Sequence, residues 1–317
     1  MTLRRRIPKP ADTPFAPRAA GAVAVLNALT IDVEEHFQAH AFASAIPRDT
    51  WDRQESRVVA STRRITALLA EHGVRATFFV LGWVADRHPE LVRELVAAGH
   101  EVGSHGYAHE LVYRQTRDEF ATDLARASEA IRRALGPDGC DAVLLGYRAP
   151  AFSVTDDSGW ALDVVRDQGF RYDSSVVPVA VKDGAMNAAL RGGKRRGLAG
   201  VGRFAARHGN GLWEMPPSTV ALGGRNWPVV GGGYLRLLPL FLTQGAIRRI
   251  NSEGHPAVVY LHPWEVDAEQ PEVAGAPPLA RFRHGVNLHR TESRLHRLLE
   301  TFRFGPMRDV FAAELAH

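Results

Sequence analysis

The sequence predicts an α/β protein built on a parallel sheet, and three observations support this fold class. Short β-type segments alternate with helix-type segments along most of the 317 residues. The connections are short, and glycines such as Gly73 and Gly99 directly follow the predicted helices, as expected of a residue that ends a helix. Polar residues gather just after the predicted strands, which is where the chemistry of α/β folds is found.

In the first half of the chain, predicted strands are each followed by a predicted helix. The first strand, at 23–31, ends in Asp32, and the helix at 56–72 places most of its apolar residues on one face. The segments that follow are a strand at 75–81, a helix at 89–98, a strand at 100–103, a helix at 118–135, a strand at 143–147 and a helix at 158–168. A further β-type segment at 170–172 leads into Asp173.

The alternation breaks between about residues 180 and 235, which we interpret as a flexible, basic insertion with irregular strands. Its glycines do not form a phosphate-binding loop, because no Gly-Lys-Ser/Thr sequence opens a helix there. A solvated loop explains its basic run better than an anionic partner does. Regular structure is predicted to resume with a helix at 237–253, a strand at 257–261, a Pro-rich loop at 268–278 and a closing helix at 291–302.

Composition limits the class of protein. We expect a disordered basic arm at 1–20 and a single domain at 21–317, because 45% hydrophobic and 23% charged residues suffice to build a core. A net charge of +4 is too small to indicate nucleic acid as a partner. The single cysteine, Cys140, excludes a disulfide within the chain and a cysteine-based metal site. We expect a cytoplasmic protein, since no signal sequence and no run of about 18 apolar residues is recognisable.

Two histidines, His105 and His109, lie four residues apart directly after the predicted strand at 100–103. If this segment is helical or tightly turned, both imidazoles lie on one side and can bind one metal ion. Neutral imidazole suits Zn²⁺. For an isolated pair, two exposed polar residues on a turn are the simpler interpretation. The metal hypothesis therefore depends on whether the chain supplies a third ligand, an acid and a base.

Other polar residues occupy the same position after other strands. Asp32 and Glu34 end the first strand, where an extended backbone points both side chains to one side and Glu35 to the other. The equivalent positions after later strands are held by Arg148, Asp173 and His262. Because the carboxyl ends of parallel strands meet at one edge, these clusters favour a common site over unrelated loop residues.

Taken together, five motifs in order resemble those of the polysaccharide deacetylases, the NodB-homology or carbohydrate esterase 4 enzymes. The motifs are Thr30-Ile31-Asp32-x-Glu34, Ser104-His105-x-x-x-His109, Tyr147-Arg148-x-Pro150, Asp173-Ser174-Ser175 and Leu261-His262. The resemblance covers about residues 26–265. The opening at 32–37 and the tail at 231–284 are similar to a subgroup associated with exopolysaccharide loci and the exosortase/PEP-CTERM system.

The resemblance implies a fold class, a cofactor and a reaction. The fold is a distorted (β/α) barrel with fewer than eight parallel strands, here with an irregular insertion and a family-specific C-terminal part at about 235–317. The cofactor is a divalent metal, usually zinc, and the reaction removes acetyl from an N-acetylated sugar. By position, the resemblance implies that Asp32 is the catalytic base, Arg148 its partner and His262 the general acid. It also implies that both histidines of the pair bind the metal.

The sequence departs from the family pattern at three positions. Val33 stands where a second metal-binding Asp is usual, so the ligand is Glu34 or Glu35. We choose Glu34 because strand alternation puts it beside the catalytic base. Ala151 replaces a frequent aromatic residue, but its backbone N–H can still donate to an oxyanion. Asp173 matches the later Asp motif only loosely, where the resemblance implies a residue that keeps the acid histidine protonated.

These residues would support hydrolysis of an amide. A bound metal lowers the pKa of water towards about 7 and polarises the carbonyl group. Asp32 would accept the water proton, and His262 would protonate the leaving amine. The predicted substrate- and oxyanion-binding residues beside them are Ala151, Pro150, Phe152 and Trp264. For the two aromatic residues, stacking on a sugar ring and packing in the core are equally good interpretations.

We therefore predict a metal-dependent polysaccharide N-deacetylase, most plausibly with Zn²⁺, in bacterial exopolysaccharide biosynthesis. Its expected partner is an N-acetylated polysaccharide or its lipid-linked precursor. The basic arm and the Arg-rich insertion could attach the protein peripherally to the inner membrane. Two alternatives stay open: a cyclic-amide amidohydrolase on the same fold, without metal, and a non-catalytic saccharide-binding protein. The oligomeric state is left open by the sequence.

Overall fold

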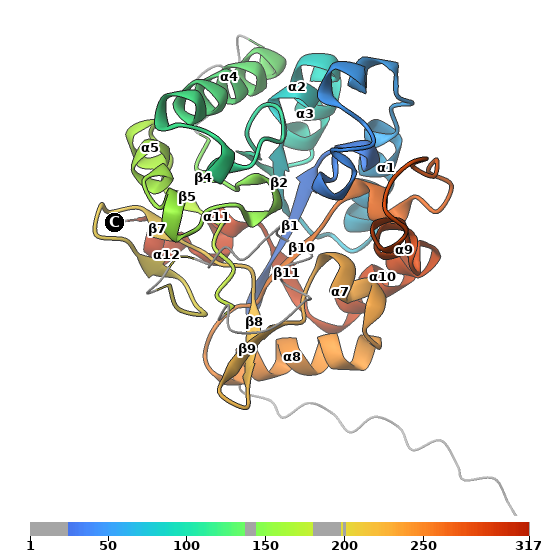
Figure 1. Ribbon diagram of the computed structural model, residues 1–317. Coiled ribbons are helices and arrows are strands. Elements are labelled where there is room, and N and C mark those ends of the chain that lie inside the picture. The colour runs from blue at the N-terminus through green and yellow to red at the C-terminus, as the bar shows by residue number, and fades with distance from the viewer. Residues whose placement is uncertain (1–24, 137–143, 180–197, 199–200, 317) are drawn as a thin grey trace, which may run out of the picture.

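The computed structural model describes residues 25–136, 144–179, 198 and 201–316 and shows one sheet surrounded by helices (Figure 1). The nine-stranded sheet runs in the order β10-β1-β2-β3-β4-β5-β7-β6, with β11 also paired to β1. Its strands are β1 (Leu26–Val33), β2 (Thr77–Val80), β3 (Glu101–Ser104), β4 (Gly146–Tyr147), β5 (Tyr172–Asp173), β6 (Ala206–Arg207), β7 (Trp213–Glu214), β10 (Val258–Leu261) and β11 (Arg303–Gly305). Strands β8 (Thr219–Leu222) and β9 (Arg225–Pro228) form a separate antiparallel hairpin.

The neighbouring strands β10, β1, β2, β3, β4, β5 and β7 are all parallel and curl into part of a barrel. Strand β6 pairs antiparallel with β7 at one end. Strand β11 does not extend the series: it pairs with the first residues of β1, whereas β2 pairs with the last ones. The predicted fold class, a distorted barrel with fewer than eight strands in a parallel series, is confirmed.

The helices lie around the outside of the curled sheet (Figure 1). They are α1 (Val58–Glu71), α2 (Gly82–Arg87), α3 (Pro89–Ala97), α4 (Arg117–Leu135), α5 (Ala161–Asp167), α7 (Gly232–Leu237), α8 (Leu240–Ser252), α9 (Pro278–Gly285), α10 (Thr291–Thr301), α11 (Met307–Val310) and α12 (Ala312–Leu315). Short 3₁₀ segments are found at His36–Gln38, His40–Phe42, Arg48–Arg53, Val112–Arg114, Pro150–Phe152, Asp156–Ser158, Pro263–Val266 and Leu288–Arg290.

Strand β1 lies at the centre of the fold, since it pairs with β10, β2 and β11. Its residues Leu29, Ile31 and Val33 are fully buried in the main core, as the predicted apolar strand requires. In the parallel register, Ile31 is paired with Leu261 of β10. The polar residues that follow these two strands therefore meet at one edge of the sheet.

Most predicted elements of the first half are present with slightly shorter bounds. The helices predicted at 56–72, 89–98 and 118–135 correspond to α1, α3 and α4. A capping box explains the start of α4: the Thr116 side chain accepts from the Glu119 backbone N–H, and the Glu119 carboxylate accepts from the Thr116 N–H. Local capping and periodicity were thus enough to define these helices.

Three predictions of secondary structure were wrong in detail. The helix predicted at 237–253 is α8 and begins only at Leu240, because Pro239 before it has an extended backbone, and the short helix α7 that precedes it was not predicted. The helix α2 was missed: it is a short helix directly after β2. The helix at 291–302 does not close the domain, since β11 returns to the sheet after it.

Some sequence predictions lie outside the described residues. These are the basic arm at 1–20, Cys140, and the parts of the insertion at 180–197 and 199–200. Among the residues that are described, none of the helices combines the length and the apolar character needed to cross a bilayer.

Gly146 of β4 lies against the ring of Tyr172, its register partner in β5. A Cβ atom at this glycine would lie 2.1 Å from Cζ of the tyrosine ring. That ring is fully buried, and its hydroxyl donates to Glu101 Oε1 at 3.1 Å. Because neither the ring nor the paired backbone has room to move, this position requires glycine.

We expect Gly146→Ala to lower the free energy of unfolding by about 1–3 kcal/mol, the usual cost of overpacking a core. Urea denaturation followed by circular dichroism measures it. The matched control is Gly245→Ala on the exposed side of α8, where an added Cβ meets nothing within 4 Å. This control should stabilise the protein by about 0.5–1 kcal/mol. Equal effects in both variants would contradict the close packing of β4 on β5.

Candidate active site

The loops at the carboxyl ends of β1, β3, β4 and β10 bring together most of the predicted site residues. The buried side chains that meet there are Asp32, Glu34, His105, His109 and Arg148, and the half-buried His262 joins them. They come from segments far apart in the sequence. The site therefore exists only in the folded sheet.

Glu34, His105 and His109 form a cluster with the composition of a metal site. One potential ligand atom from each residue lies within 4.8 Å of the others. Glu34 Oε2 lies 2.7 Å from His109 Nε2, yet this buried oxygen has no hydrogen-bond partner among the described residues. A carboxylate oxygen and two imidazole nitrogens pointing at a common centre are the donor set of catalytic zinc sites. The three residues fit a divalent metal.

His105 is held in the tautomer that a metal ligand needs. Its Nδ1 lies 2.7 Å from the carbonyl oxygen of Arg148, which can only accept, so Nδ1 carries the proton. Burial lowers the pKa of His105 to about 4, which keeps the ring neutral. Its Nε2 lone pair is therefore available to the cluster.

The turn that carries the two histidines is tight rather than helical. Gly106 and His109 both have positive φ angles, of 75° and 51°. Asp123 on α4 accepts from the backbone N–H groups of Tyr107 and Ala108, at 2.8 and 3.3 Å. The role of Asp123 was not predicted from the sequence. Buried backbone N–H groups of a turn need an acceptor, and a carboxylate on a helix that faces the turn can supply it.

Glu34 and Glu35 have different partners. The Glu35 carboxylate accepts from the backbone N–H groups of Arg57 and Val58 and from the Ser56 hydroxyl, and it thereby caps α1. Glu34 points to the other side of the chain and joins the histidines, as strand alternation predicted. The structure thus places Glu34, and not Glu35, in the metal cluster.

Trp264 holds Glu34 in place. Its indole N–H donates to Glu34 Oε1 at 3.0 Å, which leaves the other carboxylate oxygen facing His109. One face of the indole stacks on His262, with ring centroids 4.9 Å apart, and the other on His284, at 4.0 Å. Stacking of Trp264 on a sugar ring, one of the two interpretations of the sequence, is therefore wrong, because both faces are covered.

Asp32 and Arg148 form a buried ion pair. Arg148 Nη1 donates to Asp32 Oδ1 at 2.8 Å and to the Thr30 hydroxyl at 2.7 Å. Its other nitrogens donate to the Ser174 carbonyl and hydroxyl oxygens, so the fully buried guanidinium is paired on all sides. The second oxygen of Asp32 lies 3.9 Å from His262 Nε2.

His262 lies across the site from the histidine pair. Its Nε2 is 3.8 Å from Glu34 Oε1, and its Nδ1 is 2.6 Å from Glu265 Oε1. Burial alone would lower the pKa of His262, but the hydrogen bond to Glu265 and the neighbouring carboxylates outweigh burial and raise this pKa to about 9. His262 is therefore protonated at neutral pH, as a general acid must be.

Glu265 and Arg236 were not identified from the sequence as site residues. Arg236 of α7 donates through Nε to Glu265 Oε2 at 2.9 Å, and both side chains are buried. Burial raises the pKa of the Glu265 carboxyl, but Arg236 and His262 more than offset this and lower it. The row of His262, Glu265 and Arg236 alternates in charge. The sequence feature that could have identified Glu265 is a carboxylate three residues after the histidine.

The prediction that Asp173 holds His262 protonated is wrong. Asp173 accepts from the Ser175 hydroxyl at 2.6 Å and from the Ser175 N–H at 2.9 Å. The Ser175 oxygen in turn accepts from the Ala149 N–H at 2.7 Å. Burial raises the pKa of Asp173, and the adjacent carboxyl of Glu214 raises it further. Asp173 supports the segment after β4, while Glu265 occupies the place beside His262.

The predicted oxyanion segment has an unusual backbone. Ala151 and Phe152 both have φ angles of 52°, in the left-handed region. Pro150 is buried, whereas Phe152 is half-buried and contacts Tyr260 edge to face, with centroids 4.9 Å apart. Strained backbone of this kind is commonly found where a main-chain group is aimed at a ligand. The role of Ala151 as an oxyanion donor stays a prediction.

Comparisons with known proteins agree with this site. The family described as "Polysaccharide deacetylase" matches residues 49–172, which include His105, His109 and Arg148. A family described as a domain of unknown function, DUF3473, matches residues 174–312, which include His262 and Glu265. Residues 49–172 are thus similar to the polysaccharide deacetylases of the NodB-homology type.

Curated relatives match part of the chain. A peptidoglycan-N-acetylglucosamine deacetylase of Bacillus cereus is 33% identical over 75 residues, 24% of this chain and 27% of the relative. A chitooligosaccharide deacetylase of Sinorhizobium fredii is 38% identical over 96 residues, 30% of this chain and 43% of the relative. The chain thus matches less than half the length of these relatives.

One solved structure is similar over nearly the whole length. It is the crystal structure of a Mycobacterium smegmatis protein assigned as a polysaccharide deacetylase, with 21% identity and a TM-score of 0.59. The similarity covers 96% of this chain and 95% of the other. It shows that the two proteins share a fold.

Trp264→Phe should weaken binding of Zn²⁺ by about 10–100-fold, the usual effect of losing a group that orients a metal ligand. The variant keeps an aromatic ring between His262 and His284 but cannot donate to Glu34. Competition with a chromophoric chelator gives the dissociation constant. The matched control is Trp213→Phe, because the Trp213 N–H has no hydrogen-bond partner among the described residues. Wild-type affinity in Trp264→Phe would contradict this role of the indole.

Proposed function

We propose that the protein is a metal-dependent hydrolase that removes N-acetyl groups from a bacterial polysaccharide or its lipid-linked precursor. The observation that carries this proposal is the arrangement of two opposed groups in one site. Glu34, His105 and His109 lie on one side, and the protonated His262 lies on the other. Asp32 lies between them, 3.9 Å from His262.

Each residue of the site has its own role in the proposed reaction. A bound divalent metal, for which we propose Zn²⁺, would supply a Lewis acid for the acetyl carbonyl and a more acidic water. Asp32, held by the hydrogen bond from Arg148, accepts the proton of the attacking water. The backbone N–H of Ala151 donates to the oxyanion, which is worth about 10²–10³ in rate for a single donor. His262 gives its proton to the departing amine nitrogen, and Glu265 keeps this acid charged.

The proposed substrate is a polymer or oligomer that contains N-acetylglucosamine. Support comes from the relatives, whose names specify chitooligosaccharides and the N-acetylglucosamine of peptidoglycan. A role in exopolysaccharide biosynthesis is our extension of this proposal. It rests on the resemblance of the segments at 32–37 and 231–284 to the exopolysaccharide-associated subgroup.

The first test is acetate release from N-acetylglucosamine oligomers by chelator-stripped protein, before and after addition of Zn²⁺. We expect release only after the metal is restored, and His105→Ala should abolish it. Release that is insensitive to the chelator would instead support a metal-free amidohydrolase. Saccharide binding without release in either state would support a binding protein, and both results would overturn the proposal.

Glu34→Gln and Glu35→Gln form a matched pair of neighbouring variants. Glu34→Gln should lower the rate of acetate release at least about 100-fold, because an amide is a poor substitute for a carboxylate ligand. Glu35→Gln should keep the rate but lose about 1 kcal/mol of stability, since Glu35 caps α1. Rates and urea denaturation of both variants separate the two effects. Loss of activity in Glu35→Gln alone would reverse the assignment.

Glu265→Gln tests the general acid through the pH dependence of kcat/KM. The hydrogen bond to Glu265 raises the pKa of His262, so the neutral amide should let that pKa fall by about 1–3 units. Because the acid must be protonated, the alkaline limb of the profile should move to lower pH. The acidic limb, which reports the base, should stay in place. An unmoved alkaline limb would contradict the proposed pairing.

A further inference from the structure

Helices α8 and α9 present large apolar side chains to solvent. On α8, Phe241 is 66% exposed and Leu242 is 44% exposed. On α9, Leu279 is 59% exposed and Phe282 is 61% exposed. Leu and Phe are usually buried, and two exposed pairs, one on α8 and one on α9, are more than isolated exceptions.

Helix α9 is built almost entirely as a surface element, since none of its residues is buried. Leu279 and Phe282 are three residues apart and therefore lie on one face of it. On α8, the exposed residues Phe241, Leu242 and Gly245 are followed on the same face by Arg248 and Arg249. The outer face of α8 thus combines apolar and cationic side chains, and that of α9 is apolar.

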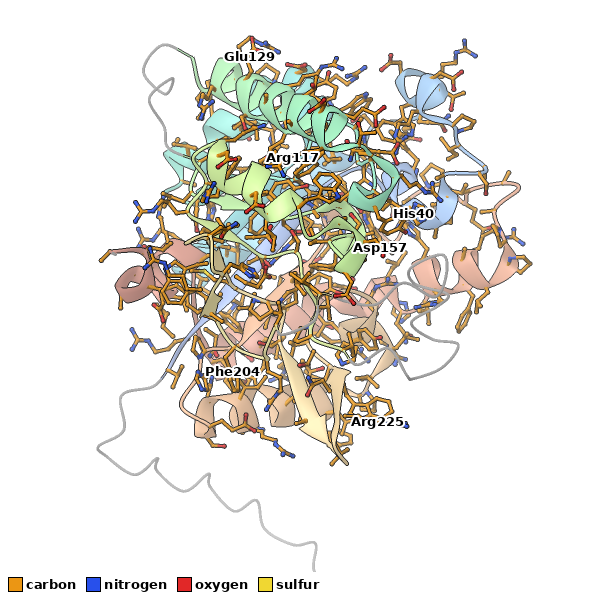
Figure 2. The ribbon with its side chains drawn as sticks, turned by 60° about the vertical axis from the view of Figure 1, so that its left-hand side comes forward. His40, Arg117, Glu129, Asp157, Phe204 and Arg225 are labelled. Atoms are coloured by element: carbon orange, nitrogen blue, oxygen red, sulfur yellow. The ribbon has the colours of Figure 1, made fainter. Side chains whose placement is uncertain are left out.

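The charge on these helices has one sign. Helices α7, α8 and α9 contain no Asp or Glu residue, whereas each contains arginine. Arg248, Arg249 and Arg281 are exposed, and two of them also lie near carboxylates just outside the helices: Arg249 is 3.2 Å from Glu253 and Arg281 is 4.0 Å from Glu272. Beside them, Figure 2 shows Arg225 at the outer end of the β8–β9 hairpin, which contacts α8. Helices with apolar residues and arginine on the outer face have the composition of interfacial helices that bind anionic lipid.

This outer face is physically continuous with the candidate active site. Arg236 of α7 donates to the carbonyl oxygens of His284 and Val286, at the end of α9. The same guanidinium pairs with Glu265, which binds His262. Figure 1 shows α7, α8 and α9 on one side of the molecule, around the β10 edge of the sheet. A substrate held at a surface beneath these helices would be close to the site.

We propose that the outer faces of α8 and α9 dock the protein on an anionic phospholipid bilayer. Phe241, Leu242, Leu279 and Phe282 enter the boundary between headgroups and acyl chains, while the arginines bind lipid phosphates. Docking of this kind does not depend on catalysis. Its consequence for the enzyme, that a lipid-linked glycan is the natural form of the substrate, rests on the proposed function.

The test is co-sedimentation of the full-length protein with vesicles. Wild-type protein should bind vesicles of equimolar phosphatidylglycerol and phosphatidylcholine, and should bind vesicles of pure phosphatidylcholine much less. The variant Phe241→Ser/Phe282→Ser leaves the net charge unchanged and should reduce the partition coefficient at least about tenfold. The matched control is Val96→Ser, since Val96 is 43% exposed on α3, outside these helices. This control should bind like the wild type.

Three results would overturn the proposal. They are absence of wild-type binding to the anionic vesicles, equal binding by the double variant, and a wild-type dimer that the double variant converts to monomer without any vesicle binding. The last result would show that a second copy of the chain covers this face. Acetate release from soluble oligomers should be equal in all three proteins. If the deacetylase proposal is wrong, none of the three proteins will release acetate, and the vesicle result will be unaffected.

Discussion

The buried guanidinium of Arg148 is the interaction on which the rest of the site depends. Removing a charge from water is expensive unless every polar group around it is paired. Arg148 satisfies this condition by binding Asp32 and Thr30 of β1 and both oxygens of Ser174 after β5. Its own carbonyl oxygen accepts from His105. One residue thus holds Asp32, the proposed base, contacts residues of β1 and residues that follow β3 and β5, and sets the tautomer of His105, a candidate metal ligand.

The site is divided between the two halves of the chain, and neither half is complete alone. Residues 49–172 supply the histidine pair and Arg148, whereas residues 174–312 supply the acid, its carboxylate and the indole that holds Glu34. Strand β1, which precedes both matched regions, carries Asp32 and pairs with β2 on one side and β10 on the other. The region that matches the domain of unknown function therefore contributes strands to the same sheet and side chains to the same candidate site.

Features of the structure that depend on neighbouring residues in the sequence were predicted correctly. Strand alternation separated Glu34 from Glu35, and periodicity with caps located α1, α3 and α4 within a few residues. The partners of His262 could not be predicted in the same way. Arg236 lies 29 positions before Glu265, and only the packing of α7 beside β10 joins them. Asp173 was misassigned because its motif position suggested the site, while its side chain is used by Ser175 two residues later.

The position of the candidate metal ligand Glu34 has a physical consequence for His262, the proposed general acid. Glu34 lies close to both His109 and His262, so its negative charge acts on both imidazoles. A cation bound by Glu34 would neutralise that charge and withdraw support from the protonated imidazole. Glu265 does not face the metal cluster, and Arg236 keeps it ionised on the far side. The pair of Glu265 and Arg236 would therefore keep His262 protonated if Glu34 binds a metal, as we propose.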